Sequence, residues 1–132
     1  MPRPRNARFS VFKGKEAKLN RAIFRALASK GRLTTWDIFK QVKSYRGLGY
    51  TRYANVNLRV KALAASGYVA VTGTIKTKPG FLGAVYELTT RAILSMLLNS
   101  LDLEDLLLQI DEPTTSEILA AVTASTIDSL SL

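Results

Sequence analysis

The sequence predicts an α+β fold that is mainly α, with three helices, a two- to three-stranded β element and a C-terminal helical extension. Three observations predict it. Apolar residues recur at helical spacing within residues 15–43 and again within residues 51–67. The pattern then becomes that of two strands over residues 68–89, and leucine-rich helical spacing returns from residue 90. A chain of 132 residues can hold one domain with a real core and one appended element.

Residues 1–14 are predicted to form a basic arm, because two prolines and several like charges oppose a helix. Two interpretations of Arg3 and Arg5 stay open. They belong to a disordered tail, or to an arm that follows a minor groove or the phosphates of a duplex. Aromatic and apolar residues at positions 9–12 can anchor the end of this arm to the core.

A first helix is predicted over residues 15–30, with one apolar face and a glycine stop at Gly31. A second helix begins after Thr34, which has the spacing of an N-terminal capping box with Asp37. Trp36 lies to one side of that helix's apolar face. We interpret it as packing over the joint between helices rather than as a platform for base stacking.

Residues 44–50 contain two glycines and predict a loop. Arg46 in this loop can contact a phosphate, and Thr51 can cap the third helix. That helix, residues 51–67, has an apolar arc of about 100° that contains Val56 and Val60.

The opposite arc of the third helix has Leu58 at its centre, with alanines around it and Asn55 and Asn57 at its borders. An ordinary surface helix would fit this geometry too. A side-chain amide can pair with adenine in a bidentate way, so the two asparagines are candidate base readers. Leu58 can press on a thymine methyl group or belong to a protein contact.

Residues 68–75 and 81–89 predict two strands joined by the basic turn KTKPG, residues 76–80. Lys76 and Lys78 would hold this projecting hairpin on a nucleic-acid backbone, or they belong to a solvated turn. After the hairpin, Thr89 or Thr90 can cap a fourth helix.

Residues 90–132 are acidic and leucine-rich, with a pause at residues 111–113 and a last helical segment over residues 115–130. Because the domain needs no such excess of leucine to close its own core, we expect a homodimer interface here. The alternative is a helical hairpin that folds back on its own domain.

Charge is divided unevenly along the chain. Residues 1–78 hold 18 of the 19 Lys and Arg against Glu16 and Asp37, a net charge of +16, whereas residues 79–132 sum to −7. A basic domain attracts polyanions through counterion release, and nucleic acid is the commonest such partner. The dispersed basic residues do not favour binding to a membrane surface.

The chain has no cysteine and no histidine. It therefore lacks disulfides, the thiolate and imidazole metal ligands, and the usual nucleophile and base pairs. We expect no enzyme, no cofactor and no metal site. The N-terminal segment lacks the apolar stretch of a signal peptide, and no segment reaches the length of a membrane span. The expected location is the cytoplasm, on the chromosome.

The order helix, extended step, helix, loop, helix, hairpin resembles a winged helix-turn-helix domain over residues 15–89. The most specific part is VNLRVKALAASGYVAV at residues 56–71, and YELT at residues 86–89 resembles the second wing strand of MarR or PadR regulators. The resemblance implies a sequence-specific, double-stranded DNA-binding transcription regulator with residues 51–67 as recognition helix and residues 68–89 as wing. Modules of this fold also bind RNA or the ribosome, or dock on proteins, and both alternatives stay open.

The resemblance and the charge pattern give a set of candidate DNA-binding residues. Arginines and lysines on the third helix and its preceding loop would fix the register on phosphates. The full set is Arg3, Arg5, Arg46, Thr51, Arg52, Asn55, Asn57, Leu58, Arg59, Lys61, Lys76 and Lys78. The outward position of Leu58 departs from the Ser, Thr, Arg or Gln that the family often has there.

Overall fold

The computed structural model describes residues 9–78 and 81–130, with side chains over residues 9–76 and 83–126. The chain divides into two compact units, and the second begins at Ser100. The sequence analysis places the boundary earlier, after Thr89. In the structure, the fourth helix belongs to the first unit and not to the C-terminal extension. Each unit is described by itself below.

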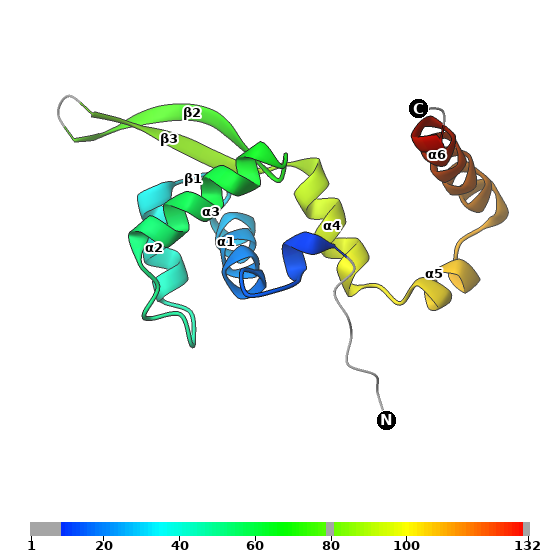
Figure 1. Ribbon diagram of the computed structural model, residues 1–132, viewed down its shortest axis with the longest axis horizontal. Helices are drawn as coiled ribbons and strands as arrows, with labels where there is room; N and C mark the ends of the chain where they lie inside the picture. The colour runs from blue at the N-terminus through cyan, green and yellow to red at the C-terminus, as the bar shows by residue number, and fades with distance from the viewer. Residues whose placement is uncertain (1–8, 79–80, 131–132) are drawn as a thin grey trace. The chain divides into compact units, whose positions relative to one another are not determined.

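The first unit has three helices followed by a long antiparallel hairpin, and a short strand completes a three-stranded sheet of order β1-β3-β2 (Figure 1). Its elements are η1 (Ser10–Phe12), α1 (Ala17–Lys30), β1 (Leu33–Thr34), α2 (Thr35–Lys43), α3 (Tyr53–Ala65), β2 (Val69–Lys78), β3 (Phe81–Leu88) and α4 (Thr90–Ser100). This arrangement is the winged helix-turn-helix fold that the sequence predicts.

Local chemistry sets the ends of the first two helices as predicted. Gly31 has a φ of +88° and donates its N–H to the carbonyl of Leu27 at 2.7 Å, which ends α1 in a conformation that favours glycine. The Thr34 side chain accepts the N–H of Asp37 at 3.2 Å and caps α2.

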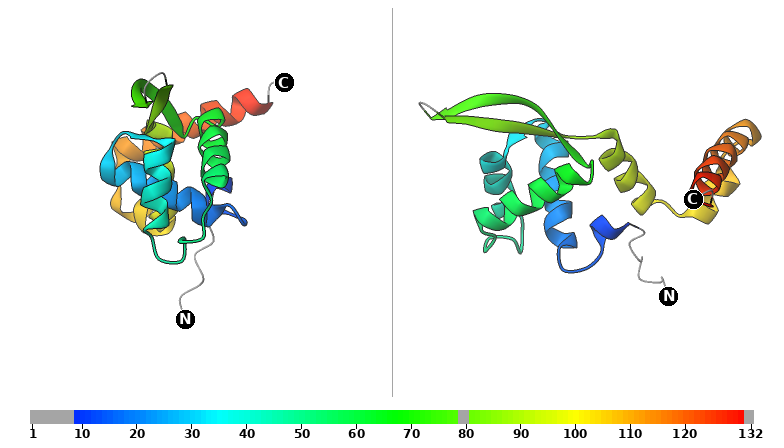
Figure 2. Two further views of the ribbon diagram at one scale, coloured as in Figure 1. Left: turned by 90° about the vertical axis from the view of Figure 1, so that its left-hand side faces the viewer. Right: turned by 45° about the horizontal axis from the view of Figure 1, so that its top comes forward.

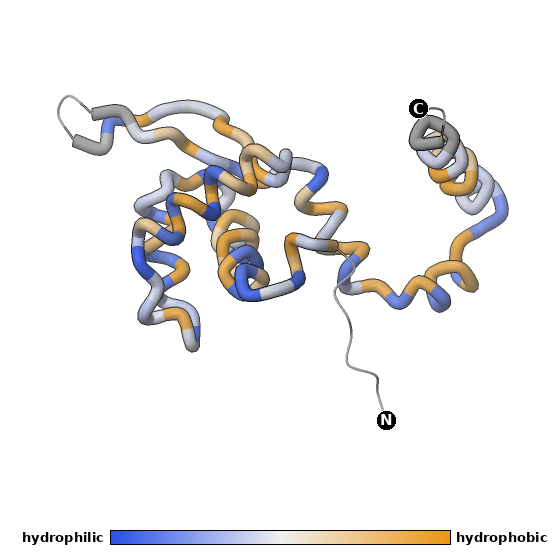
Figure 3. The backbone as a smooth tube through the Cα atoms, in the orientation of Figure 1, coloured by the Kyte–Doolittle hydropathy of each residue, from blue (hydrophilic) through white to orange (hydrophobic). Residues whose placement is uncertain are grey.

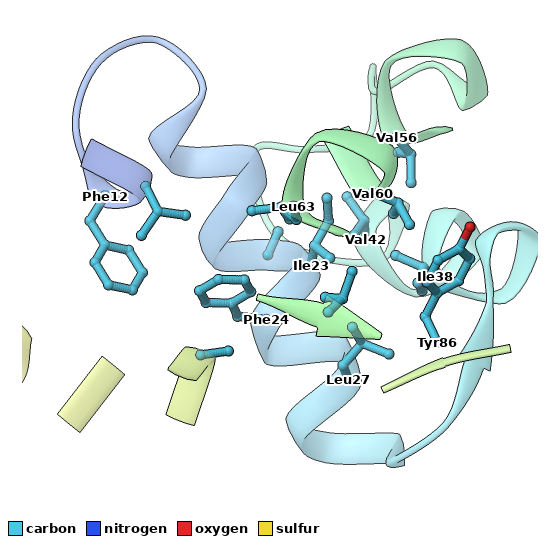
Figure 4. Close-up of a cluster of buried hydrophobic side chains, with 14 residues drawn as sticks. Phe12, Ile23, Phe24, Leu27, Ile38, Val42, Val56, Val60, Leu63 and Tyr86 are labelled. Carbon is cyan, nitrogen blue, oxygen red and sulfur yellow. The ribbon is translucent and has the colours of Figure 1, made fainter. Parts of the chain in front are cut away.

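The core forms where the apolar stripes of α1, α2 and α3 meet the sheet (Figure 4). Ile23, Ile38 and Val60 are fully buried there. Phe12 of η1 packs edge-to-face on Phe24 of α1, with ring centroids 5.7 Å apart. The apolar end of the N-terminal arm is thus anchored in the core, as the sequence predicts.

The first wing strand is longer than the sequence predicts, whereas the second ends one residue earlier, at Leu88. The β2 strand continues to Lys78 and β3 begins at Phe81, so Lys76 and Lys78 lie within a strand and not in the turn. The pairs Val71↔Tyr86 and Gly73↔Val85 leave one extra residue in β2, a β-bulge that bends the hairpin. The hairpin extends past the helices of this unit in the right-hand view of Figure 2.

The junction after the wing joins three elements. The Thr89 hydroxyl donates to the Gly67 carbonyl at 2.6 Å and accepts the Ala92 N–H at 3.3 Å, which caps α4 as predicted. The backbone N–H of Thr89 also donates to the carbonyl of Tyr68 at 3.0 Å. The end of α3, the root of the wing and the start of α4 therefore meet at one residue.

The second unit contains α5 (Leu103–Gln109) and α6 (Glu112–Leu130). An aspartate side chain precedes each helix: Asp102 accepts the N–H of Asp105 at 3.3 Å, and Asp111 accepts the N–H of Thr114 at 2.8 Å. The last helix thus begins earlier than the predicted residue 115. None of the described side chains in this unit is buried, and apolar residues recur along both helices (Figure 3).

Candidate nucleic-acid interface

The α3 helix presents one face to the core and the other to solvent. Val56 and Val60 are fully buried, whereas Leu58 on the outer side is 64% exposed. Asn55 is exposed, and Asn57 is only partly exposed because it lies nearer the core face. The outer surface of α3 therefore has the mixed, alanine-rich character that the sequence predicts, with Asn55 as its accessible amide.

The start of α3 differs from the prediction. Arg52, with an extended backbone, is the N-cap residue, and no side chain caps the helix. Thr51 is partly buried and uses its backbone N–H to donate to the Leu48 carbonyl at 3.1 Å. The predicted Thr51 cap is wrong, because the chain turns into the helix one residue later.

A Schellman motif ends α3. The N–H of Tyr68 donates to the Leu63 carbonyl at 2.9 Å and that of Gly67 to the Ala64 carbonyl at 3.1 Å. Gly67 has a φ of +81°, and an added Cβ would lie 2.8 Å from the guanidinium of Arg91. The left-handed backbone favours glycine here, as the predicted helix stop implies, and an added Cβ would have to displace the flexible Arg91 guanidinium.

Arg59 does not point freely into solvent. Its Nε donates to Oδ1 of Asn20, a buried residue of α1, at 3.1 Å, and it lies 3.9 Å from a carboxylate oxygen of Glu16. Asn20 in turn donates to the carbonyl of Val11 at 2.9 Å. Arg59 thus belongs to a polar network that joins the arm's anchor, α1 and α3.

The loop between α2 and α3 is held against α1. Lys18 donates to the carbonyl of Gly47 at 3.3 Å, and the guanidinium of Arg25 lies over the ring of Tyr45 at 4.2 Å. Arg46 between these contacts is exposed. The two contacts therefore fix the loop that presents Arg46.

The wing is fixed by an arginine that the sequence did not single out. Arg32, just before β1, donates to the side chain and the carbonyl of Thr72 at 3.0 and 2.9 Å. Thr72 is the extra residue of the β2 bulge. Lys76 farther along β2 is exposed, whereas the side chain of Lys78 lies outside the described part.

The predicted arm residues Arg3 and Arg5 also lie outside the described residues. The structure shows how the arm's end is held: Asn20 binds the Val11 carbonyl, and Arg21 donates to the Phe12 carbonyl at 3.1 Å. Side chains of α1 therefore fix the point from which the arm departs.

Three aromatic rings gather where α2 and α3 begin. Trp36, Phe39 and Tyr53 have ring centroids 5.2 to 5.7 Å apart, and Trp36 remains 52% exposed. Trp36 covers the joint between the helices, as the sequence predicts. Tyr53 was missed, although its position three residues before Val56 on a helix is a signal that it faces α2.

Charge separates cleanly between the two units. All 19 Lys and Arg precede Ser100, together with three carboxylates, whereas the segment from Ser100 onward carries seven carboxylates and no base. In the described part of the chain, carboxylates pair only with Lys40 and Arg59. Among these described residues, no hydrogen bond or ion pair engages the side chains of Arg46, Arg52 or Lys61. Most of the basic charge is thus left without an acidic partner.

Within residues 9–78 and 81–130, no three acidic side chains come together as metal ligands would. No helix in that part of the chain is long and apolar enough to cross a bilayer.

The chain was compared with protein families, curated proteins and solved structures. No family model matches the chain, and no curated protein matches it. Among solved structures, the chain is similar to Bacillus subtilis PadR, determined in complex with operator DNA, with 18% sequence identity and a TM-score of 0.47. The match covers 80% of this chain and 58% of the PadR chain, so this chain spans less than two thirds of that protein.

Proposed function

We propose that this protein is a sequence-specific, double-stranded DNA-binding transcription regulator that acts on chromosomal DNA in the cytoplasm. The observation that carries the proposal is the basic winged helix unit, in which Arg46, Arg52 and Lys61 around the outer face of α3 have no carboxylate partner among the residues that the structure describes. Like charges on one surface repel one another. Binding of these cations to the phosphates of a nucleic acid removes this repulsion and releases the counterions of the nucleic acid, which favours binding.

In the proposed complex, α3 enters the major groove with Asn55 toward base edges and Leu58 toward thymine methyl groups. Arg46, Arg52 and Lys61 contact phosphates on either side. These roles fit the exposure of the five side chains. We leave Arg59 out of the phosphate-binding set, because its Nε is already bonded to Asn20.

The wing and the arm enlarge this interface in the proposal. Lys76 and Lys78 follow the backbone beside the groove, and Arg3 and Arg5 extend the footprint. The clamp between Arg32 and Thr72 supports this arrangement, because it fixes the wing root relative to β1.

We further propose that the protein binds DNA as a homodimer formed through residues 90–132. The second unit supports this, because none of its described side chains is buried and large apolar side chains are open to solvent. An exposed apolar surface of this kind is typical of protein interfaces. The exposed residues include Leu107, Leu108, Ile118, Leu119 and Val122.

The proposal is tested by measuring affinity for short duplexes over a range of salt concentrations. If each subunit neutralises about five phosphates, log affinity falls against log salt with a slope near −4 to −5 per subunit. Selection from random duplexes then gives the preferred sequence, and a palindrome in it reports the dimer.

Two results would replace this proposal by its alternatives. Structured RNA that displaces duplex DNA at equal salt would favour an RNA-binding module. Failure to retard any nucleic acid at physiological salt would favour a protein-docking module.

A further inference from the structure

An exposed aromatic cluster, Trp36, Phe39 and Tyr53, is left without a role by the proposed interface. Trp36 is 52% exposed and Tyr53 40% exposed. The centroid of Trp36 lies 5.2 Å from that of Phe39 and 5.7 Å from that of Tyr53. The rings support one another and still present a substantial apolar surface to solvent.

The cluster lies at the start of two helices. Trp36 is the second residue of α2, and Tyr53 is the first residue of α3. In helix-turn-helix docking, the N-terminal part of the recognition helix enters the groove while the preceding helix crosses the backbone. The cluster therefore occupies the position where one strand's backbone would pass between the two helices.

Cations border the aromatic cluster. The ammonium group of Lys43 lies 5.4 Å from the centre of the Phe39 ring, and Arg52 directly precedes Tyr53. The nearby carboxylate of Asp37 is paired with Lys40 at 3.5 Å. An apolar surface with a positive border complements a deoxyribose–phosphate backbone, which alternates apolar sugar faces with anionic groups.

The ring geometry favours the backbone over an unpaired base. Trp36 is tilted by 46° and 48° to its two neighbours, and Phe39 and Tyr53 stand at 89° to each other. Stacking of unpaired bases uses open, flat ring faces, whereas these tilted rings form an uneven surface. We propose that the cluster packs against the sugars of one strand of duplex DNA; the inference rests on the proposed function.

Trp36 is the single tryptophan of the chain, so fluorescence excited at wavelengths that tyrosine does not absorb reports on it alone. Full-length protein is titrated with a labelled duplex at low salt, binding is followed by the anisotropy of the label, and acrylamide quenching of Trp36 is measured in the free and bound states. We expect bound duplex to lower the quenching constant.

The outcomes separate this contact from the proposed function. Duplex binding with Trp36 as accessible as in the free protein would overturn the contact and leave the proposed function standing. Absence of duplex binding would overturn both. Stronger protection of Trp36 by single-stranded DNA than by duplex, at equal salt, would replace the backbone contact by base stacking.

Substitutions test how much the proposed Trp36 contact contributes to the affinity for duplex DNA. Trp36→Ala should weaken binding to all duplexes about tenfold, as expected for losing roughly 50 Å² of apolar contact, with no change in the salt slope. Lys43→Ala should instead lower that slope by about one. Trp36→Phe should retain most of the affinity.

Tyr50→Ala is the matched control, since Tyr50 is 98% exposed and lies outside the cluster. It should leave duplex affinity unchanged. Thermal unfolding of each variant separates weaker binding from loss of fold. A folded Trp36→Ala variant with wild-type affinity would overturn the inference.

Discussion

Arg59 and Lys61 lie two residues apart on α3, and we expect the first to stabilise the fold and the second to bind DNA. Arg59 donates to the buried Asn20 of α1 at 3.1 Å, whereas Lys61 is exposed on the outer face. We predict that Arg59→Ala lowers the stability of the domain, and that Lys61→Ala lowers the affinity for DNA.

The magnitude for Arg59 follows from what its loss leaves behind. Asn20 is only 2% exposed, so its Oδ1 would lose its partner in a site with little access to water. Leaving a buried acceptor unpaired costs about 1–3 kcal/mol. The 3.9 Å contact with Glu16 adds little, because that carboxylate is 46% exposed and screened by solvent. A loss of about 2 kcal/mol would lower the Tm of a domain of this size by roughly 10 °C.

The assay combines urea unfolding with salt-dependent DNA binding for both variants. Lys61→Ala should keep the wild-type urea midpoint and reduce the salt slope by about one. Arg59→Ala should shift the midpoint and, where the protein is folded, keep the slope. In the Asn20→Ala background, Arg59→Ala should cost much less, because the two effects are not additive.

The opposite pattern would refute the reasoning. If Arg59→Ala is as stable as wild type and removes one unit of salt slope, the arginine contacts phosphate and its bond to Asn20 contributes nothing measurable.

Three further predictions concern other parts of the chain. In urea unfolding, Gly67→Ala should cost about 1–2 kcal/mol for its left-handed backbone, together with the exposed hydrogen bond from Arg91 to the Ser66 carbonyl, because the guanidinium must move away from the new Cβ. Gly14→Ala, at a φ of +76° with open space, should show only the backbone cost. Leu119→Asp should convert a dimer of twice 14.5 kDa to monomer in sedimentation, whereas Glu117→Gln should not, and a wild-type monomer would contradict the dimer. Hydrogen bonds from the side chain and backbone of Thr114 lower the pKa of Asp111 below its ordinary value of 3.8. The contribution of this cap to the stability of α6 is therefore fully present above pH 3.8 and is lost as the pH falls through the lower pKa of the folded state. NMR titration of the Asp111 carboxyl measures this pKa, and a carboxyl that titrates at or above 3.8 would contradict the prediction.

Features set by chemistry within a few residues could be predicted from the sequence. The Gly31 stop, the Thr34 cap and the Thr89 cap each depend on atoms no more than four positions apart. The buried stripe of α3 follows from helical periodicity alone. The winged helix fold was predictable because these local signals agree with one another.

The partner of Arg59 could not be predicted, because Asn20 is 39 residues away. Helical geometry places Arg59 only about 60° from the buried Val56, which indicates that it borders the core but not what it contacts. For the same reason, the hydrogen bonds between Arg32 and Thr72, which are 40 residues apart, could not be predicted from the sequence.

The starts of two helices, α3 and α6, were predicted at the wrong residue. Thr51 has the chemistry of a cap, but the backbone places Arg52 at that position. Pro113 indicated a pause, yet α6 starts at Glu112, because a proline in the first turn lacks only an N–H that the helix does not use. In both places, residue type alone did not fix the position of the first turn.

The junction at Thr89 removes a degree of freedom from the molecule. Its hydroxyl binds the Gly67 carbonyl and caps α4, and Arg91 of α4 donates to the Ser66 carbonyl at 2.9 Å. A rotation of α4 must therefore break these bonds or turn the end of α3 and the wing root with it. In the proposed complex with DNA, a tilt of α4 would therefore change the angle at which α3 meets the groove.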